Sequence, residues 1–263
     1  MDLKLNDKVV LITGSSKGIG KAIAEEFATE GARISICARG RQDLEIAADA
    51  IRGRGASVIA TPADVNLAED VKRTINATME AFGRIDVLVN NAGDIVVGRS
   101  ITATDEQWRD TLEVNLLSAV RFSRSVVPIM RKQSGGRIIN ISSCFARTVP
   151  MTGAIDYWAA KAALLSFSRT LATEVAADNI LVNSVCPGFT ESPMLDRIYN
   201  QAMPILEVSR REDVAEAFQR FLLIKRMGQA EEVAALVTFL ASGRASYITG
   251  SVFDVDGGFL KSI

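Results

Sequence analysis

The chain has 263 residues, with 30 lysines and arginines against 31 aspartates and glutamates. Apolar residues make up 48% of it and charged residues 23%, which is typical of a globular protein and argues against disorder. A net charge of −1 lacks the basic excess that nucleic acid or anionic lipid attracts, so we expect neither as a partner. The chain has no histidine, which excludes a Ser-His-Asp triad, an HExxH zinc site and any histidine acid–base chemistry.

The three cysteines, Cys37, Cys144 and Cys186, have no CxxC spacing, so we expect neither a metal site nor a disulfide framework. The N-terminus has no apolar signal region, and no run approaches the roughly 18 apolar residues of a membrane span. The sequence therefore predicts a cytoplasmic protein without a membrane partner.

Short β-rich runs alternate with helical periodicity along the whole chain. The predicted strands are residues 9–13, 33–38, 57–61, 85–90, 137–142, 180–186 and 251–255. The predicted helices are residues 18–30, 42–52, 68–82, 105 to about 128–132, 156–177 and 231–240. This order is typical of the α/β class: a single doubly wound Rossmann-type domain, residues 1–263, whose seven-stranded parallel sheet has helices on both faces.

Residues 190–227 form the irregular part of the pattern and separate the sixth strand from the last helix. An insertion at the carboxyl end of a strand lies over the ligand crevice of such a fold. We therefore interpret this segment as a substrate lid rather than a second domain.

The segment between the first strand and the first helix reads TGSSKGIG, residues 13–20. Its glycines allow a tight turn and bring a pyrophosphate close to backbone N–H groups at the helix N-terminus. Turns are glycine-rich in general, but this position between strand and helix favours a nucleotide site. The expected cofactor contacts here are Gly14, Ser16, Lys17, Gly18, Ile19 and Gly20.

The end of the second strand indicates which cofactor is bound. A site for NAD(H) places a carboxylate there for the ribose 2′-hydroxyl, but this chain has Ala38 and Arg39. Lys17 adds a second cation. Two cations without an anion favour the 2′-phosphate of NADP(H) over NAD(H), unless Arg39 is merely a solvated loop residue.

Tyr157 and Lys161 lie four residues apart in a predicted helix, so the phenol and the ammonium share one face. A phenol with its ordinary pKa near 10 is a poor acid–base group at neutral pH, and a neighbouring cation lowers that pKa. Such a pair occurs by chance in some chains, but beside a nucleotide site it suits proton transfer between a ketone and an alcohol.

Further short motifs accompany this pair in a fixed order. They are Asp64-Val65, Asn90-Asn91-Ala92-Gly93, Asn115, Ile141-Ser142-Ser143, Pro187-Gly188, and Ile248-Thr249-Gly250 with Asp256-Gly257-Gly258. With these motifs the chain resembles the short-chain dehydrogenase/reductase family over essentially its whole length.

The resemblance implies four catalytic roles. Tyr157 is the general acid/base, and Lys161 lowers its pKa and holds the nicotinamide ribose. Ser143 polarises the substrate carbonyl, although it lies fourteen residues before Tyr157 where the family usually has thirteen. Asn115 orients a water that connects Lys161 to solvent; otherwise it is an ordinary helix residue.

The resemblance also implies cofactor contacts beyond the glycine-rich turn. Asp64 and Val65 flank the adenine, although Asp64 could be only a turn residue. Asn91 lies on the adenosine side, with Ala92 and Gly93 beside it in the motif. Pro187 and Gly188 pass next to the nicotinamide. Thr190 and Ser192 are both candidates for the contact with its carboxamide.

The implied reaction is NADP(H)-dependent hydride transfer between the nicotinamide and a small-molecule ketone or secondary alcohol. The expected pocket side chains make the substrate apolar and of moderate size. They are Phe145, Val149, Met151, Phe189, Met194, Leu195, Ile198, Tyr199 and Met203.

Three alternatives remain open. The nearest subfamily is the 3-oxoacyl-[acyl-carrier-protein] reductases, but the positions that should be basic for a carrier protein are Ser134 and Asp178, with Arg131 and Lys132 only nearby. An acyl carrier protein is therefore not the favoured partner. A nucleotide-sugar epimerase or dehydratase is disfavoured by the spacing of Gly14, Gly18 and Gly20. A non-catalytic NADP(H) sensor is disfavoured by the intact Ser143, Tyr157 and Lys161.

The helix 156–177 carries apolar side chains on more than one face, which one sheet cannot cover. We therefore expect a homo-oligomer that pairs this helix and the helix 105–130 with their copies. The family resemblance implies a tetramer.

Overall fold

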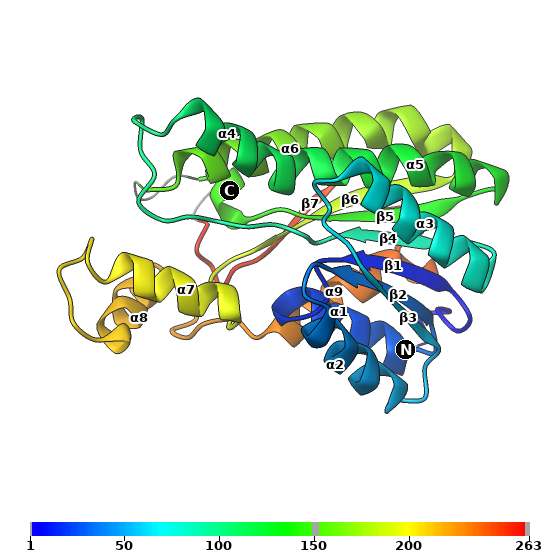
Figure 1. Cartoon of the computed structure of the whole chain (residues 1–263), viewed down its shortest axis with the longest axis horizontal. Coiled ribbons are helices and arrows are strands. Elements are labelled where there is room, and N and C mark those ends of the chain that lie inside the picture. The colour runs from blue at the N-terminus through cyan, green and yellow to red at the C-terminus, as the bar shows by residue number, and fades with distance from the viewer. Residues whose placement is uncertain (1, 149–152, 261–263) are drawn as a thin grey trace.

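The computed structural model describes residues 2–148 and 153–260, and within them seven parallel strands form one sheet of order β3-β2-β1-β4-β5-β6-β7 (Figure 1). The chain crosses from β3 at one edge to β4 beside β1, so the order reverses between β1 and β4. Ligands bind at such a switch point in open α/β sheets. The strands are β1 (Val9–Thr13), β2 (Arg33–Ala38), β3 (Val58–Pro62), β4 (Val87–Asn90), β5 (Gly136–Ile141), β6 (Ile180–Pro187) and β7 (Val252–Val255).

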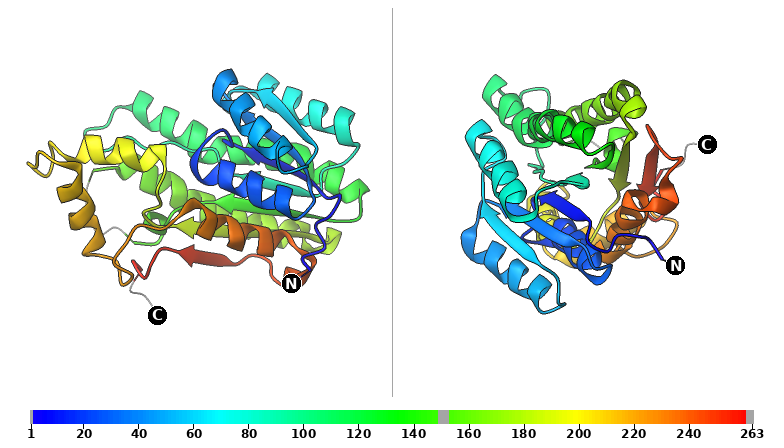
Figure 2. Two further views of the ribbon diagram at one scale, coloured as in Figure 1. Left: turned by 90° about the horizontal axis from the view of Figure 1, so that it is seen from below. Right: turned by 90° about the vertical axis from the view of Figure 1, so that its right-hand side faces the viewer.

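Helices cover both faces of the sheet, which confirms the predicted α/β class. One face carries α1 (Gly18–Thr29), α2 (Arg41–Arg52) and α9 (Ala230–Ala241) (Figure 2). The other face carries α3 (Ala68–Phe82), α5 (Ser118–Lys132) and α6 (Ile155–Val175).

Strand β1 shows why the central strands are apolar throughout. All five of its residues are buried. Val10 and Ile12 pack with α1, α2 and α9, whereas Leu11 packs with α3, α5 and α6. Successive side chains of a strand point to opposite faces, so a strand covered on both faces needs an apolar residue at every position.

The single long helix expected from residue 105 to about 130 is interrupted in the structure. It consists of α4 (Asp105–Leu112), a π-helical turn (Glu113–Leu117) and α5. A π-helical turn inserts one extra residue into the helix and is frequent at functional sites. Asn115 lies in this turn.

Residues 190–227 are not irregular, which corrects the sequence-based expectation. They contain α7 (Pro193–Ala202) and α8 (Arg211–Gln219). Helix α7 has an ordinary start signal, since the Ser192 hydroxyl accepts the backbone N–H of Leu195 at 3.2 Å and Pro193 occupies the first turn. Both helices project from the sheet beyond α1 (Figure 1).

No helix in the described part of the chain is both long and apolar enough to span a bilayer. Among those same residues, no group of three or more cysteine or acidic side chains is arranged to hold a metal ion.

Candidate active site

A pocket of about 430 Å³ opens where β1, β4, β5 and β6 end. Fifteen of the residues predicted for catalysis or cofactor binding line it: Gly14, Lys17, Gly18, Ile19, Gly20, Asn91, Ala92, Gly93, Ser143, Tyr157, Lys161, Pro187, Gly188, Thr190 and Ser192. The other predicted site residues, Ser16, Arg39, Asp64, Val65 and Asn115, do not line this pocket. The topology therefore brings together segments that are far apart in sequence.

The glycine-rich turn is packed too tightly for side chains. A Cβ atom on Gly14 would lie 2.8 Å from the Ala92 Cα, and one on Gly20 would lie 2.4 Å from the Gly14 oxygen. Gly14 also has φ +64°, a conformation that favours glycine. Asn91 holds the turn, because its Nδ2 donates to the backbone oxygens of Thr13 and Gly14, each at 3.0 Å.

Thr13 was missed as a site residue by sequence reasoning. Its hydroxyl accepts the backbone N–H groups of Asn91 and Ala92, each at 3.0 Å. It therefore joins the end of β1 to the segment after β4. A hydroxyl residue at the end of a buried strand was the sequence feature that could have indicated this role.

The N-terminus of α1 suits an anionic group. Its N-cap, Lys17, forms no side-chain cap, and the first turn contains no acidic residue. The first N–H groups of a helix have no partner within the helix, and the helix dipole favours negative charge there. Together with the tightly packed glycines, this end of the pocket fits the phosphates of a dinucleotide.

The charges proposed to select the cofactor include an anion that the sequence pattern did not reveal. Lys17 Nζ lies 2.8 Å from a carboxylate oxygen of Asp43, in the first turn of α2. Arg39 is exposed at the end of β2. The expectation of two cations without an anion was therefore wrong, because Asp43 is paired with one of them.

Asp64 and Val65 follow β3 and lie outside the pocket lining. The Asp64 backbone N–H donates to Asp70 at 2.8 Å, and its carboxylate accepts the N–H of Asn66 at 3.0 Å. Val65 is buried. The carboxylate of Asp64 thus stabilises the turn after β3. Its contact with the adenine stays a prediction.

Ser143, Tyr157 and Lys161 meet beyond the end of β5. All three are buried, and Lys161 Nζ lies 5.7 Å from the centroid of the Tyr157 ring. Lys161 also donates to the backbone oxygen of Ile141 at 3.0 Å. The Ser142 hydroxyl is engaged elsewhere, since it donates to the Lys161 backbone oxygen at 3.0 Å. This hydrogen bond favours Ser143 as the group next to the phenol.

Burial controls the ionisation of this pair. It raises the pKa of Tyr157, and a hydrogen bond with Ser143 acts in the opposite direction. Burial also lowers the pKa of Lys161 to about 8. The expected lowering of the phenol pKa is not seen in this structure, because desolvation of the phenolate outweighs the neighbouring groups. The phenol is therefore protonated at neutral pH and can act as an acid.

Asn115 lies behind the pocket rather than in it. Its Nδ2 donates to the backbone oxygens of Asp94 and Thr111, at 2.8 and 3.0 Å, and its Oδ1 accepts the Asp94 N–H at 3.1 Å. A Cβ on Gly93 would lie 2.9 Å from that Oδ1 and 3.2 Å from Lys161 Nζ. The π-helical turn thus places Asn115 beside Lys161, while its side chain fixes the backbone of Asp94.

The segment after β6 lies close to the C-terminal strand. A Cβ on Gly188 would lie 2.8 Å from the Asp256 Cα. Both candidate hydroxyls are engaged locally: Thr190 donates to the Gly188 oxygen and Ser192 to the Thr190 oxygen, each at 3.1 Å. Ser192 is in addition the cap of α7, so Thr190 has fewer competing partners.

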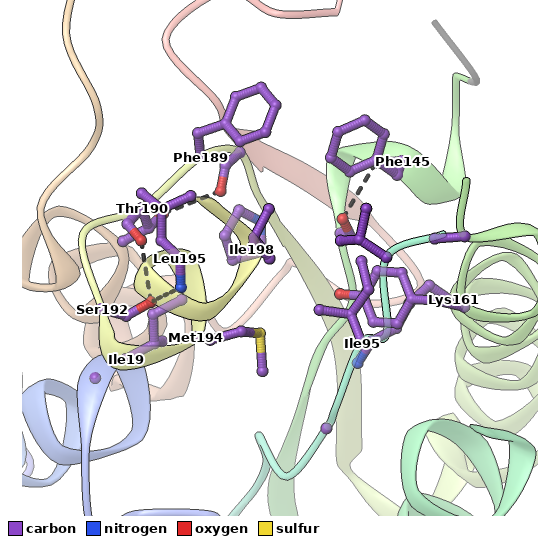
Figure 3. A pocket seen from close by; sticks show the side chains of 18 of the residues that line it. Ile19, Ile95, Phe145, Lys161, Phe189, Thr190, Ser192, Met194, Leu195 and Ile198 are labelled. Carbon is purple, nitrogen blue, oxygen red and sulfur yellow. Dashed lines mark hydrogen bonds between the residues drawn. The ribbon is translucent and has the colours of Figure 1, made fainter. Parts of the chain in front are cut away.

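The remaining lining of the pocket is apolar. Met194, Leu195 and Ile198 of α7 face Ile95 and Phe145 across the pocket (Figure 3). Of the expected substrate contacts, Phe189 also lines it, whereas Tyr199 and Met203 do not. Val149 and Met151 lie outside the described residues. The lining residues that were not expected as cofactor or substrate contacts are Ile95, Val97, Ile141, Ser142, Gly153, Ala154, Trp158, Pro193, Ala202, Ile205, Leu206 and Phe218.

Comparison with known proteins agrees with this geometry. A family model described as enoyl-(acyl carrier protein) reductase matches residues 14–260. The 3-oxoacyl-[acyl-carrier-protein] reductase of Escherichia coli is 37% identical over 97% of this chain and 98% of its own.

Two solved structures are similar as well. L-sorbose reductase from Gluconobacter frateurii, in complex with NADPH and L-sorbose, is 39% identical with a TM-score of 0.93 and full coverage of both chains. A variant of actinorhodin polyketide ketoreductase with NADPH is 33% identical, also with a TM-score of 0.93, over 97% of this chain and 98% of that chain.

Proposed function

Because the chain belongs to the short-chain dehydrogenase/reductase family, we propose that it reduces an apolar ketone with NADPH, or oxidises the corresponding secondary alcohol with NADP+. One observation carries this proposal. The buried Ser143, Tyr157 and Lys161 lie in a pocket that has an uncapped helix N-terminus on one side and apolar side chains on the other.

When bound, NADPH supplies the hydride that the carbonyl carbon receives. Tyr157 donates its phenolic proton to the carbonyl oxygen, which completes the alcohol. Ser143 donates a hydrogen bond to the same oxygen and stabilises the negative charge that develops on it. Lys161 stabilises the resulting phenolate, and Asn115 keeps the backbone beside Lys161 in place.

The preference for NADP(H) rests on Arg39 and on the absence of a carboxylate at positions 38 and 39. Lys17 contributes less than its charge suggests, because Asp43 is its partner. Two related structures were solved with NADPH. Replacing Arg39 with Glu should raise the KM for NADPH by at least about 10-fold, because one charge-assisted contact is worth roughly 1.5–3 kcal/mol. The KM for NADH should rise less.

The apolar lining argues against a polyhydroxylated substrate. A sugar in this pocket would place hydroxyls against Ile95, Met194 and Ile198, where they find no side-chain partner. A buried hydroxyl without a partner costs about 1–3 kcal/mol. We therefore place the substrate among ketones with an apolar body, despite the identity with L-sorbose reductase.

The alternative function, a reductase of substrates attached to an acyl carrier protein, has less support because Arg131 is already paired. Arg131 Nε lies 2.7 Å from the Asp178 carboxylate, so this nearby cation is already neutralised. A substrate presented as a small molecule fits this surface better than one attached to an acidic carrier. We further propose that residues 190–227 act as the lid over the substrate and that the active form is a homo-oligomer.

Initial rates of NADPH and NADH oxidation test this proposal. The substrates are acetophenone, L-sorbose, and an acetoacetyl group on a small thioester and on acyl carrier protein. We expect kcat/KM for acetophenone to exceed that for L-sorbose by at least about 30-fold, from two or more unpaired hydroxyls. A preference for L-sorbose would overturn the assignment of the substrate. Turnover on the carrier protein alone would replace it with the alternative.

A further inference from the structure

Two side chains of α7 hold this helix against the segment after β4. Arg197 donates to the Asp94 carboxylate and, at 3.4 Å, to the backbone oxygen of Ile95. One helical turn later, Gln201 Oε1 accepts the backbone N–H of Val97 at 3.0 Å. Residues four apart share a helix face, so both contacts lie on one side of α7.

A neighbouring stripe of the same helix lines the pocket. Met194, Ile198 and Ala202 recur every four residues and all belong to the pocket lining. Ile95 lies across the pocket from Met194 and Ile198 (Figure 3), and Val97, two residues further along, also lines the pocket. The two polar contacts therefore set the separation between the two apolar walls.

The segment 94–99 is attached at three further points. Both backbone polar groups of Asp94 bond the Asn115 side chain. The Gly98 N–H donates to the Gly153 oxygen at 2.6 Å, and Arg99 forms a parallel bridge with Ala154, just before α6. The backbone N–H groups of Asp94, Val97 and Gly98 are thus satisfied by three different parts of the chain. A shift of α7 against this segment reaches both Asn115 and the start of the helix that carries Tyr157.

The ion pair between Asp94 and Arg197 is accessible to solvent. The side chains of Asp94 and Arg197 are 39% and 46% exposed, so solvent and salt screen their attraction. The contact between α7 and residues 94–97 is therefore modest in strength and sensitive to salt.

We propose that Arg197 and Gln201 are positioning residues that clasp α7 to residues 94–97 and so set the shape of the substrate end of the pocket. Where it concerns turnover, this proposal rests on the proposed function. Neither residue reaches the reacting atoms. Their loss weakens substrate binding and leaves the rate of the chemical step unchanged.

Hydrogen exchange of α7 tests the clasp without any substrate. The variant Arg197→Met should speed exchange of the α7 amides by about 3- to 10-fold, the loss expected for an exposed pair with one added hydrogen bond. Arg210→Met is the matched control, because it removes an equal charge from the same 190–227 segment. Arg210 pairs with Asp213 at the N-terminus of α8 and does not contact α7 through this pair. Unchanged α7 exchange in Arg197→Met, or equal acceleration in both variants, would overturn the proposal.

Steady-state kinetics with NADPH and acetophenone provide the second readout. Arg197→Met should raise the KM for the ketone by about 3- to 10-fold while kcat changes less than about 2-fold, whereas Arg197→Lys should remain close to wild type. Raising NaCl from about 0.05 to 0.5 M should raise the wild-type KM toward that of Arg197→Met and leave the variant unchanged. A fall in kcat with unchanged KM would contradict the positioning role. If wild-type protein reduces no ketone, the proposed function fails, and the exchange experiment still decides on the clasp.

Discussion

Lys161 is a buried cation, and its surroundings make its charge costly. Its side chain is 3% exposed, and its ammonium donates to the Ile141 oxygen at 3.0 Å. Desolvation lowers its pKa to about 8. The same burial raises the pKa of Tyr157, so the resting pair is a neutral phenol beside a lysine that titrates near physiological pH. In the proposed reaction, reduction of a ketone would use this neutral phenol directly, whereas alcohol oxidation would need the phenolate.

The burial of Lys161 predicts a pH-dependent stability difference. Its folded-state pKa of about 8 lies below the ordinary value of 10.5, so between these pH values the unfolded chain binds more protons than the folded protein. The free energy of unfolding contributed by Lys161 therefore rises with pH across that window. Lys161→Met removes this contribution. Urea unfolding at pH 7, 8, 9 and 10 should show the stability advantage of the variant shrinking above about pH 8. A pH-independent difference between the two proteins would contradict the lowered pKa.

The sequence predicts residues whose positions follow from local geometry. Tyr157 and Lys161 share a helix face because they are four residues apart, and Gly14 and Ser143 reach one edge because each follows a strand of a parallel sheet. Contacts between distant segments carry no such signal. The pairing of Lys17 with Asp43 is one such contact. It reduces the contribution that Lys17 can make to binding the 2′-phosphate of NADP(H).

Helix α6 is anchored at its start by a buried ion pair. The Asp156 carboxylate, 1% exposed, accepts from Arg99 at 2.6 Å and from the Thr111 hydroxyl at 2.7 Å. Arg99 also donates to the Gln107 backbone oxygen at 3.1 Å. These contacts join α4 to the turn of α6 that carries Tyr157, so they position the helix as well as stabilise it.

Removing one partner of this pair should be costly. Arg99→Met leaves the Asp156 carboxylate buried with Thr111 as its remaining side-chain donor, and breaking a buried pair from one side costs roughly 3–5 kcal/mol. Urea unfolding at pH 7 should show a loss of this order. Arg109→Met is the control on α4, because its pair with Asp105 is almost fully exposed and should contribute little. Equal stability of both variants would show that the Asp156 pair is not structural.

The bounds of some helices and strands could be predicted from the sequence, and those of others could not. β1, β2 and α3 have the predicted bounds, since their apolar periodicity coincides with burial. β4 begins at Val87 rather than at residue 85, a difference at the strand end only, since the backbone of Asp86 already hydrogen-bonds Val9 and Arg137, each at 2.9 Å. The π-helical turn around Asn115 follows from no periodicity in the sequence. Helix α7 had a readable signal in Ser192-Pro193, and the irregular interpretation overlooked it.

At the scale of the molecule, α6 leaves a face of small side chains uncovered. Ala159, Ala162 and Ser166 are exposed, and the larger Leu164 is buried. Small side chains permit close approach of a second helix, which suits the proposed homo-oligomer. Leu165, Phe167 and Leu171 are only partly buried as well, so apolar side chains lie on more than one face of α6, as expected.

A charged, bulky residue on this face tests the assembly. Ala162→Arg should reduce the oligomer of the wild type to a smaller species at micromolar concentration, because the new side chain blocks close helix packing. Sedimentation velocity measures this directly, and circular dichroism checks that the variant is folded. A monomeric wild-type protein, or an unchanged oligomer in Ala162→Arg, would contradict this interface.

The most direct test of the account compares wild type with Tyr157→Phe in NADPH oxidation on acetophenone. Loss of the phenolic proton should lower kcat/KM by at least about 100-fold, the usual contribution of general acid catalysis. NADPH binding, followed by the fluorescence of the nicotinamide, should change by less than about 3-fold, because the proposed phosphate site is the glycine-rich turn and the N-terminus of α1, away from Tyr157. Turnover that survives in Tyr157→Phe would contradict the assignment of the proton donor, and with it the proposed reaction.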